Sequence, residues 1–312
     1  MATRARVSPA HNLPLVEEPT RTIRLPDGRS LALDDVGDPS GTPVIYLHGT
    51  PDSRLSRHPD DGVAARSGVR LLALDRPGAG HSDPNPCAKL GDLADDLRAL
   101  LDELGIERAA LLGWSAGGLA ALAVAASLDT RVSGVVLVGT VPPVEAYRDD
   151  RVVAALGPGR RNLAELALEV QPAELARELA PYLVPYLVPG PLARQVTLDH
   201  VLEGAGDHGR AELAAVPGAL GRLADALEAS VAHGIEALVA DLTRQLEPGL
   251  DLEAIARPVR TIHGSEDEVS PPEVGRWLVE HLPDARADVL PGAGHHLLFP
   301  RWAEVLRWAA GG

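Results

Sequence analysis

The sequence predicts an α/β fold built on a doubly wound, mostly parallel sheet, and three observations support this prediction. Short, nearly continuous apolar runs such as 44–47 and 109–112 are typical of strands that are buried on both faces of a sheet. Amphipathic helical segments alternate with these runs; in 90–104, leucines recur every three or four residues and charges occupy the other face. Such alternation forms βαβ crossovers and parallel sheets. Finally, the region 142–250 interrupts the alternation and contains only helical patterns, which predicts an insertion.

The individual elements follow from the same patterns, taken in chain order. Segments 22–25 and 31–36 flank the turn residues Pro-Asp-Gly-Arg at 26–29, and this arrangement predicts a β-hairpin. Six further strands are predicted from apolar runs, at 44–47, 69–74, 109–112, 135–138, 259–262 and 286–290. Helices are predicted at 90–104, directly after residue 118, and within the insertion at 162–170, 173–180, 211–214 and 221–235.

The predicted organisation has three parts. Residues 1–20 form an N-terminal arm, 21–141 and 251–312 form an α/β core, and 142–250 form a helical cap over the carboxyl-terminal edge of the sheet. Within the cap, 181–189 reads Pro-Tyr-Leu-Val-Pro-Tyr-Leu-Val-Pro. Because proline lacks a backbone donor and clashes with the preceding turn, these prolines are expected to fragment any helix and to leave an irregular connector; a hinge or a wall of the pocket is the alternative.

Composition and charge exclude several classes of function. The 312 residues carry a formal net charge of −15, which argues against nucleic acid and against an anionic membrane surface as partners. Cys87 is the single cysteine, so neither an intramolecular disulfide nor a cysteine metal cluster is expected. No apolar run approaches the roughly 18 residues of a membrane span, and the N-terminal stretch lacks the apolar core of a signal peptide. A cytoplasmic location is therefore expected, and no cofactor or metal is implied.

The most informative stretch of the chain is Gly113-Trp114-Ser115-Ala116-Gly117. It lies directly after an apolar run and directly before helix-forming residues, so the serine is expected at the apex of a sharp strand-to-helix turn. The residues two positions before and after such a serine must be small to avoid a clash. A hydroxyl at this apex is exposed to a reacting group. The motif and its context together predict that Ser115 is a nucleophile.

Other segments that follow predicted strands carry the groups that acyl transfer needs. A serine hydroxyl requires a base at neutral pH, and an imidazole held by a carboxylate can take its proton. Carboxyl groups occur in 263–269, and two adjacent histidines occur in 292–296. The loop that contains Gly49-Thr50 can aim a backbone N–H at a developing oxyanion. The Thr50 N–H and the Ala116 N–H are therefore predicted to form an oxyanion hole.

Together these motifs resemble the α/β-hydrolase fold family over residues 22–309. The matching motifs are His48-Gly49, Asp-Arg-Pro-Gly-Ala-Gly-His-Ser at 75–82, the turn at 113–117, the acid loop at 264–267 and Gly294-His295. The resemblance implies a nucleophile, an acid and a base in the chain order Ser115, Asp267 and His295. It also implies a cap inserted after the strand at 135–138.

Two departures from the family patterns narrow the prediction. The dehalogenase and epoxide hydrolase branches use aspartate where this chain has Ser115, so those activities are disfavoured. The His-Gly-Gly-Pro-Gly loop associated with proline iminopeptidases is absent, because Thr50 follows Gly49. The sequence is therefore most similar to a serine esterase or a related acyl hydrolase.

Several neighbouring groups have alternative roles. Three carboxylates are alternatives to Asp267 as the orienting acid: Glu266, Glu268 and Glu145. Only one of two adjacent histidines can be the base, so His296 is expected to be a wall residue or a hydrogen-bonding residue of the site. Arg76 is expected either to pair with a carboxylate beneath the site or to form a surface ion pair. Structural roles in their loops are expected for His48, Asp75 and His81.

The sequence therefore predicts a serine hydrolase that cleaves a carboxylic ester of a small neutral or apolar molecule through an acyl-enzyme. Three alternatives stay open. The same residues can hydrolyse a C–C bond in a β-diketone-like substrate, a ligand receptor can retain the triad without turnover, and a cofactor-free oxygenase can use the same fold. The expected partner is a small molecule, and an apolar cap can also serve as the interface of a homo-oligomer.

Overall fold

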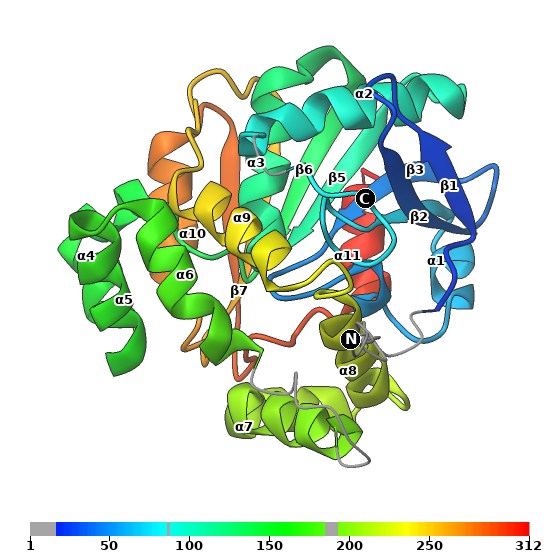
Figure 1. The fold of residues 1–312 in the computed structure, drawn as a ribbon. Helices are drawn as coiled ribbons and strands as arrows, with labels where there is room; N and C mark the ends of the chain where they lie inside the picture. Colours follow the sequence, from blue (N-terminus) through cyan, green and yellow to red (C-terminus); the bar gives the residue numbers. More distant parts are fainter. Residues whose placement is uncertain (1–16, 86–87, 185–192, 312) are drawn as a thin grey trace, which may run out of the picture.

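The computed structural model describes residues 17–85, 88–184 and 193–311 (Figure 1). Within these ranges, eight strands form one sheet in the order β1-β2-β4-β3-β5-β6-β7-β8. β2 is antiparallel to its neighbours β1 and β4, and the other neighbours are parallel, so the predicted sheet is confirmed. The strands are β1 (Arg21–Arg24), β2 (Ser30–Gly37), β3 (Thr42–Leu47), β4 (Val69–Leu74), β5 (Ala109–Trp114), β6 (Val132–Val138), β7 (Val259–Gly264) and β8 (Ala285–Leu290).

The predicted N-terminal hairpin is present as β1 and β2. In its turn, the Leu25 N–H donates to the Arg29 carbonyl at 2.8 Å, and the Gly28 N–H donates to the Leu25 carbonyl at 2.9 Å. Gly28 has a φ of 90°, which glycine adopts at little cost. The turn residues that the sequence places between the two strands therefore close the hairpin.

Helices cover both faces of the sheet (Figure 1). α2 (Leu93–Glu103), α3 (Gly117–Ser127) and α10 (Pro272–His281) share one hydrophobic core with the strands. α1 (Gly62–Arg66) and α11 (Trp302–Ala309) belong to the core on the opposite face. This double coverage accounts for the near-continuous apolar character of the strands.

β3 illustrates why these strands have no polar alternation. Ile45 and Leu47 belong to the core that contains α2 and α3, whereas Val44 and Tyr46 belong to the core that contains α11. All four residues are at most 1% exposed. Successive side chains of a strand point to opposite faces, so a strand covered on both sides must be apolar at every position. Burying each such side chain contributes about 1.5–3 kcal/mol.

Between β6 and β7 the described chain is helical, and these helices gather along one side of the sheet (Figure 1). Buried apolar residues of α6 to α9 join the core that contains α11. None of the helices in the described ranges is long and apolar enough to cross a membrane. The elements of this insertion are η4 (Val144–Arg148), α4 (Asp150–Ala155), α5 (Pro158–Glu169), α6 (Pro172–Leu183), α7 (Ala193–Ala214), α8 (Ala219–Ala229) and α9 (Ile235–Leu246).

Two helix predictions within the insertion are wrong. The segment 221–235 is not one helix, because α8 ends at Ala229 and α9 begins at Ile235. Gly234 between them has a φ of 84°, a backbone conformation that interrupts a right-handed helix. Pro181 does not break its helix either; it lies within α6, which ends at Leu183. So close to the end of a helix, a proline removes only one backbone hydrogen bond.

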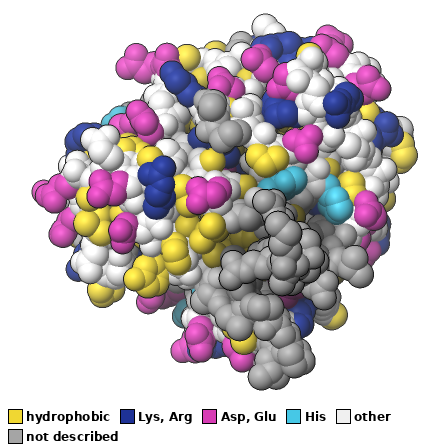
Figure 2. Space-filling model, in the orientation of Figure 1, with side chains coloured by type: hydrophobic (Ala, Val, Ile, Leu, Met, Phe, Trp, Pro, Cys, Tyr) yellow, Lys and Arg dark blue, Asp and Glu magenta, His cyan; other side chains and the backbone are white. Residues whose placement is uncertain are grey.

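Some predictions fall outside the described residues, namely those for Cys87, for 185–189 of the proline repeat and for residues 1–16 of the arm. On the face shown in Figure 2, acidic and basic side chains are interspersed, and apolar side chains are exposed over the insertion. Leu166 and Leu168 of α5 are 43% and 41% exposed.

Candidate active site

Ser115 lies at the turn between β5 and α3. Its φ of 54° makes it the one non-glycine residue with a positive φ in the described part of the chain, and such a backbone costs about 1–3 kcal/mol. The flanking glycines are required by close packing. A Cβ atom at Gly117 would overlap the Leu47 carbonyl, and a Cβ atom at Gly113 would lie 2.6 Å from the Gly117 carbonyl. The predicted strand–turn–helix geometry at Ser115 is present.

The structure brings His295 and Asp267 to Ser115. His295 Nε2 lies 3.1 Å from Ser115 Oγ, and His295 Nδ1 lies 2.8 Å from Asp267 Oδ2. Ser115 follows β5, Asp267 follows β7 and His295 follows β8. Parallel strands present their carboxyl ends at one edge of a sheet, which is where ligands bind in such folds. Residues far apart in the chain therefore meet there.

Asp267 is held in place by the backbone as well as by His295. Its Oδ1 accepts hydrogen bonds from the Val269 N–H at 2.9 Å and from the Ser270 N–H at 2.8 Å. Burial raises the pKa of Asp267, but the charge of His295 and its hydrogen bond, together with the Ser270 N–H, outweigh burial and hold the pKa below its usual value. The carboxylate is therefore ionised at neutral pH. It favours a proton on His295 Nδ1, which leaves Nε2 free to accept the Ser115 proton.

The two backbone amides predicted to form an oxyanion hole flank Ser115. Ala116 directly follows it at the start of α3, and the Thr50 loop packs against it, since a Cβ atom at Gly49 would lie 3.2 Å from Ser115 Cβ. Among the hydrogen bonds of the described residues, none uses the Thr50 N–H or the Ala116 N–H. Both donors are therefore available to a bound oxygen.

The loop of Thr50 is braced by buried polar groups. His48 Nε2 accepts the Arg76 N–H at 3.0 Å, and burial lowers the His48 pKa to about 3, which keeps the ring neutral. Arg76 donates to the Gly49 carbonyl at 2.8 Å and forms an ion pair with Asp241 of α9 at 2.6 Å. Thr50 Oγ1 donates to Asp241 at 2.8 Å. His48 thus braces its loop as predicted, and Arg76 pairs with a carboxylate beneath the site.

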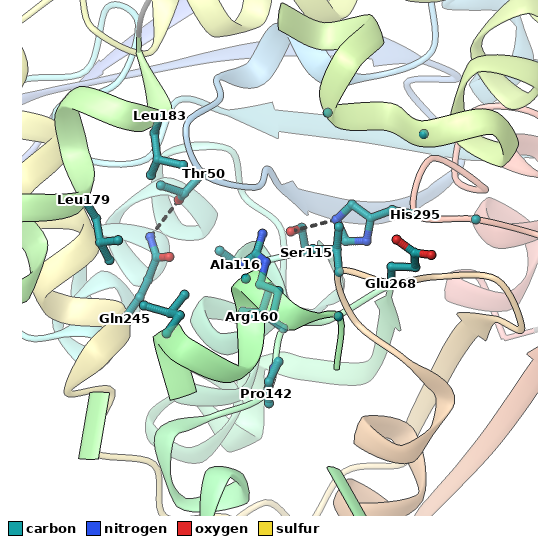
Figure 3. Close-up of a pocket in the computed structure, with 18 of the residues that line it drawn as sticks. Thr50, Ser115, Ala116, Pro142, Arg160, Leu179, Leu183, Gln245, Glu268 and His295 are labelled. Atoms are coloured by element: carbon teal, nitrogen blue, oxygen red, sulfur yellow. Dashed lines mark hydrogen bonds between the residues drawn. The ribbon is translucent and has the colours of Figure 1, made fainter. Parts of the chain in front are cut away.

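A cavity of about 780 Å³ opens over Ser115 and His295 (Figure 3). Its walls come from the core loops and from the insertion. Leu179 and Leu183 of α6 and Leu242 of α9 supply apolar wall, and the Arg160 side chain extends into the cavity toward Ala116. The insertion therefore provides the surface opposite the Ser115 hydroxyl.

A family model described as the alpha/beta hydrolase fold matches residues 42–301. The chain belongs to this family. The resemblance predicted from the motifs is thereby confirmed, and the matched range includes Ser115, Asp267 and His295.

The relatives of this α/β-hydrolase-fold protein carry different activities. It is 35% identical over 130 residues to a non-heme chloroperoxidase of Streptomyces lividans; the match covers 41% of the chain and 47% of the relative, so the chain spans about half of that relative. It is 27% identical over 289 residues to a 2-hydroxy-6-oxononadienedioate/2-hydroxy-6-oxononatrienedioate hydrolase of Cupriavidus pinatubonensis, covering 88% of the chain and 89% of the relative. A solved esterase structure from Rhodococcus sp. ECU1013 superposes with a TM-score of 0.60 at 25% identity, covering 94% and 98% of the two chains.

None of the three alternative acids forms a hydrogen bond with His295 in the part of the chain that the structure describes, although Glu266 and Glu268 line the same cavity. Glu145, Glu266 and Glu268 are exposed, and the carboxylate within hydrogen-bond distance of His295 is that of Asp267. His296 is buried against Trp114, and burial lowers its pKa to about 3. It packs edge to face against the His295 ring and is not among the residues that line the cavity, so the expected place in the wall of the site is not observed.

Asp75 and His81 also have the structural roles predicted for them. Asp75 is buried, pairs with Arg54 at 2.8 Å and accepts the His81 N–H at 2.9 Å. No group of His, Cys, Asp and Glu side chains in the described ranges is arranged to hold a metal ion.

Sequence reasoning missed several polar residues of the site, all from the insertion. Glu212 of α7 accepts the Gly294 N–H at 2.6 Å and so ties the insertion to the loop that carries His295. Arg160 and Tyr147 line the cavity, and Gln245 donates to Thr50 Oγ1 at 2.6 Å. These residues belong to no local motif, and only the folded insertion places them at the site.

Proposed function

We propose that the protein hydrolyses a carboxylic ester of a small molecule through an acyl-enzyme formed on Ser115. The observation that carries this proposal is the hydrogen-bonded series Ser115 Oγ to His295 Nε2 at 3.1 Å and His295 Nδ1 to Asp267 at 2.8 Å. A nucleophile, a base within reach of it and a carboxylate that orients the base are the elements of serine acyl transfer.

In the proposed reaction, Ser115 Oγ attacks the ester carbonyl while His295 Nε2 takes its proton. The ionised Asp267 stabilises the imidazolium, and the N–H groups of Thr50 and Ala116 donate to the oxyanion. His295 then returns the proton to the departing alcohol, which leaves the acyl group on Ser115. A water molecule, activated by His295, attacks the acyl carbonyl, and the carboxylic acid and free Ser115 are released.

We also propose that 142–250 acts as a cap that determines which substrates enter. The support is that residues of α5, α6, α7 and α9 line the cavity above Ser115. Ion pairs and hydrogen bonds, such as that between Thr50 and Asp241, connect the insertion to the loops of the core. The sequence predicts a neutral or apolar substrate, and the leucines of the cavity wall favour an apolar one.

The decisive experiment is labelling with a fluorophosphonate probe, which reacts covalently with an activated serine. The native protein is expected to be labelled and to hydrolyse p-nitrophenyl butyrate. Ser115→Ala is expected to lose both while it keeps its thermal unfolding temperature. Ser127→Ala, at the exposed end of α3, is the matched control and should behave as the native protein. Labelling of the Ser115→Ala protein would refute the assignment.

A second candidate is hydrolysis of a C–C bond in a β-diketone-like substrate by the same residues. The observation that favours it is the relative from Cupriavidus pinatubonensis, which is named as a hydrolase of hydroxy-oxo dicarboxylates and of which 89% is covered. A panel of p-nitrophenyl esters of increasing chain length, assayed beside a β-diketone ring-cleavage product, separates the two. Turnover of the diketone with none of the esters would replace ester hydrolysis by this second reaction.

A further inference from the structure

The cavity above Ser115 contains a cationic side chain for which the described residues supply no counter-ion. Arg160, in the first turn of α5, is half-buried and extends into the cavity (Figure 3). Within the described residues, its guanidinium group forms no ion pair or side-chain hydrogen bond. Among the carboxylate side chains that the structure describes, none pairs with Arg160.

Arg161, the neighbouring residue in α5, has a structural role, because its guanidinium group binds backbone carbonyls. Arg161 Nε donates to the Leu156 carbonyl at 2.7 Å, and its Nη2 donates to the Ala154 carbonyl at 2.9 Å, which completes the end of α4. The Arg160 guanidinium donates to no backbone carbonyl of the described residues. A guanidinium carries five N–H donors in a planar fork, which matches a carboxylate in two parallel hydrogen bonds. No described residue occupies the donors of Arg160, so they can bind a ligand of this kind.

Tyr147 of η4 lies beside Arg160 in the same cavity. Burial raises the pKa of Tyr147, and the positive charge of nearby Arg160 lowers it only in part, so the phenol stays protonated and can donate. Within the described residues, its hydroxyl makes no hydrogen bond. Two unsatisfied donors, one of them charged, thus face the same space.

The carboxylates at the cavity lie in a different environment. Asp207, Glu266 and Glu268 are exposed. Asp207 already pairs with Arg210, and Glu266 accepts the Ser265 hydroxyl at 3.0 Å. Exposed carboxylates are screened by water, so they do not cancel the charge of a half-buried guanidinium. The interior of the cavity therefore favours an anion.

We propose that Arg160 and Tyr147 form a subsite for a carboxylate group of the substrate. The inference rests on the proposed function and names its substrate class: an ester whose carbonyl lies at Ser115 and whose apolar chain ends in a free carboxylate. The leucines of α6 and α9 contact the chain, and Arg160 binds the carboxylate through a bidentate pair. The substrate is thus apolar along its chain, as predicted, and monoanionic instead of neutral.

Matched esters test this subsite. Methyl hydrogen adipate carries the carboxylate on the acyl side and 6-acetoxyhexanoate carries it on the alcohol side; dimethyl adipate and methyl 6-acetoxyhexanoate are the neutral partners. For the native protein, kcat/KM is expected to be higher for at least one anionic ester than for its partner. Hydrogen bonds to a charged group contribute about 1.5–3 kcal/mol, so Arg160→Met is expected to lower kcat/KM for that anion roughly 10- to 100-fold. The neutral esters should change less than about threefold.

Three further variants sharpen the test. Arg160→Lys keeps the charge without the planar fork and should retain part of the preference. Tyr147→Phe removes one donor and should lower the preference by about three- to tenfold. Arg148→Met removes an exposed arginine next to Tyr147 and is the matched control, for which no change in preference is expected.

A binding measurement keeps the subsite testable apart from turnover. Calorimetry with adipate should detect binding to the Ser115→Ala protein, and the Arg160→Met substitution in that background should abolish it. The inference is overturned when the native protein shows no preference for either anion and adipate fails to bind, or when Arg160→Met affects anionic and neutral esters equally. A different result would refute the proposed ester hydrolysis and leave the subsite intact: the native protein would hydrolyse no ester and Ser115 would not be labelled, while adipate binding would still depend on Arg160.

Discussion

Replacing Asp267 with asparagine should disable the site without disturbing its shape, because the structure determines how the new side chain must lie. Asp267 Oδ1 accepts the N–H groups of Val269 and Ser270, at 2.9 and 2.8 Å. In the variant, the amide oxygen must occupy this position, so the NH₂ group faces His295 Nδ1. That nitrogen must then accept a hydrogen bond, and the ring proton moves to Nε2, where it points at Ser115.

The magnitude follows from this change of tautomer. An imidazole protonated on Nε2 cannot take the Ser115 proton, and the imidazolium that forms during attack loses its counter-charge. In serine hydrolases with this arrangement, the same substitution lowers kcat by about 10⁴-fold. At about 1.4 kcal/mol for each factor of ten, the loss of transition-state stabilisation is about 5 kcal/mol.

The assay combines kcat for p-nitrophenyl butyrate, the rate of fluorophosphonate labelling and thermal unfolding. Asp267→Asn should lower the first two and leave the unfolding temperature within a few degrees of that of the native protein. Glu268→Gln, an exposed neighbouring carboxylate, is the matched control and should retain full activity. An Asp267→Asn protein that stays within tenfold of native activity would show that another group orients His295.

Two further predictions concern stability. Gly117→Ala places a Cβ atom against a backbone carbonyl and should lower the free energy of unfolding by about 3 kcal/mol or more. Gly159→Ala, whose added Cβ atom would have no other atom within 4 Å, should change the free energy of unfolding by at most about 1 kcal/mol. Urea unfolding of the two variants measures these effects, and equal effects would contradict the packing argument. Burial lowers the His296 pKa to about 3, below its value of 6.5 in the unfolded chain, so its contribution to stability is complete above pH 6.5 and is lost as the pH falls. His296→Phe should therefore reduce the loss of unfolding free energy between pH 7 and pH 5 by roughly 2 kcal/mol, and an unchanged pH dependence would show that His296 is not held neutral.

Most of the core could be predicted from the sequence because its signals are local. A strand buried on both faces must be apolar at successive positions, so β3 and β5 are visible as short runs in the chain. The turn at Ser115 is equally local, because glycines at 113 and 117 are needed wherever the strand and helix pack this closely. These constraints act within a few residues, and the sequence therefore determined the family, the sheet and the position of the serine.

The tertiary structure alone decided the surroundings of that serine. Whether Asp267 or a neighbouring glutamate contacts His295 depends on how the end of β7 turns, and Arg76 finds Asp241 only because α9 returns to the core loops. The ion pair joins residues 165 positions apart in the chain, a separation over which no periodic pattern carries information. Arg160 likewise differs from Arg161 in no local property. The packing of α5 directs the Arg160 guanidinium into the cavity, where it has no partner among the described residues, and places the Arg161 guanidinium against carbonyl groups.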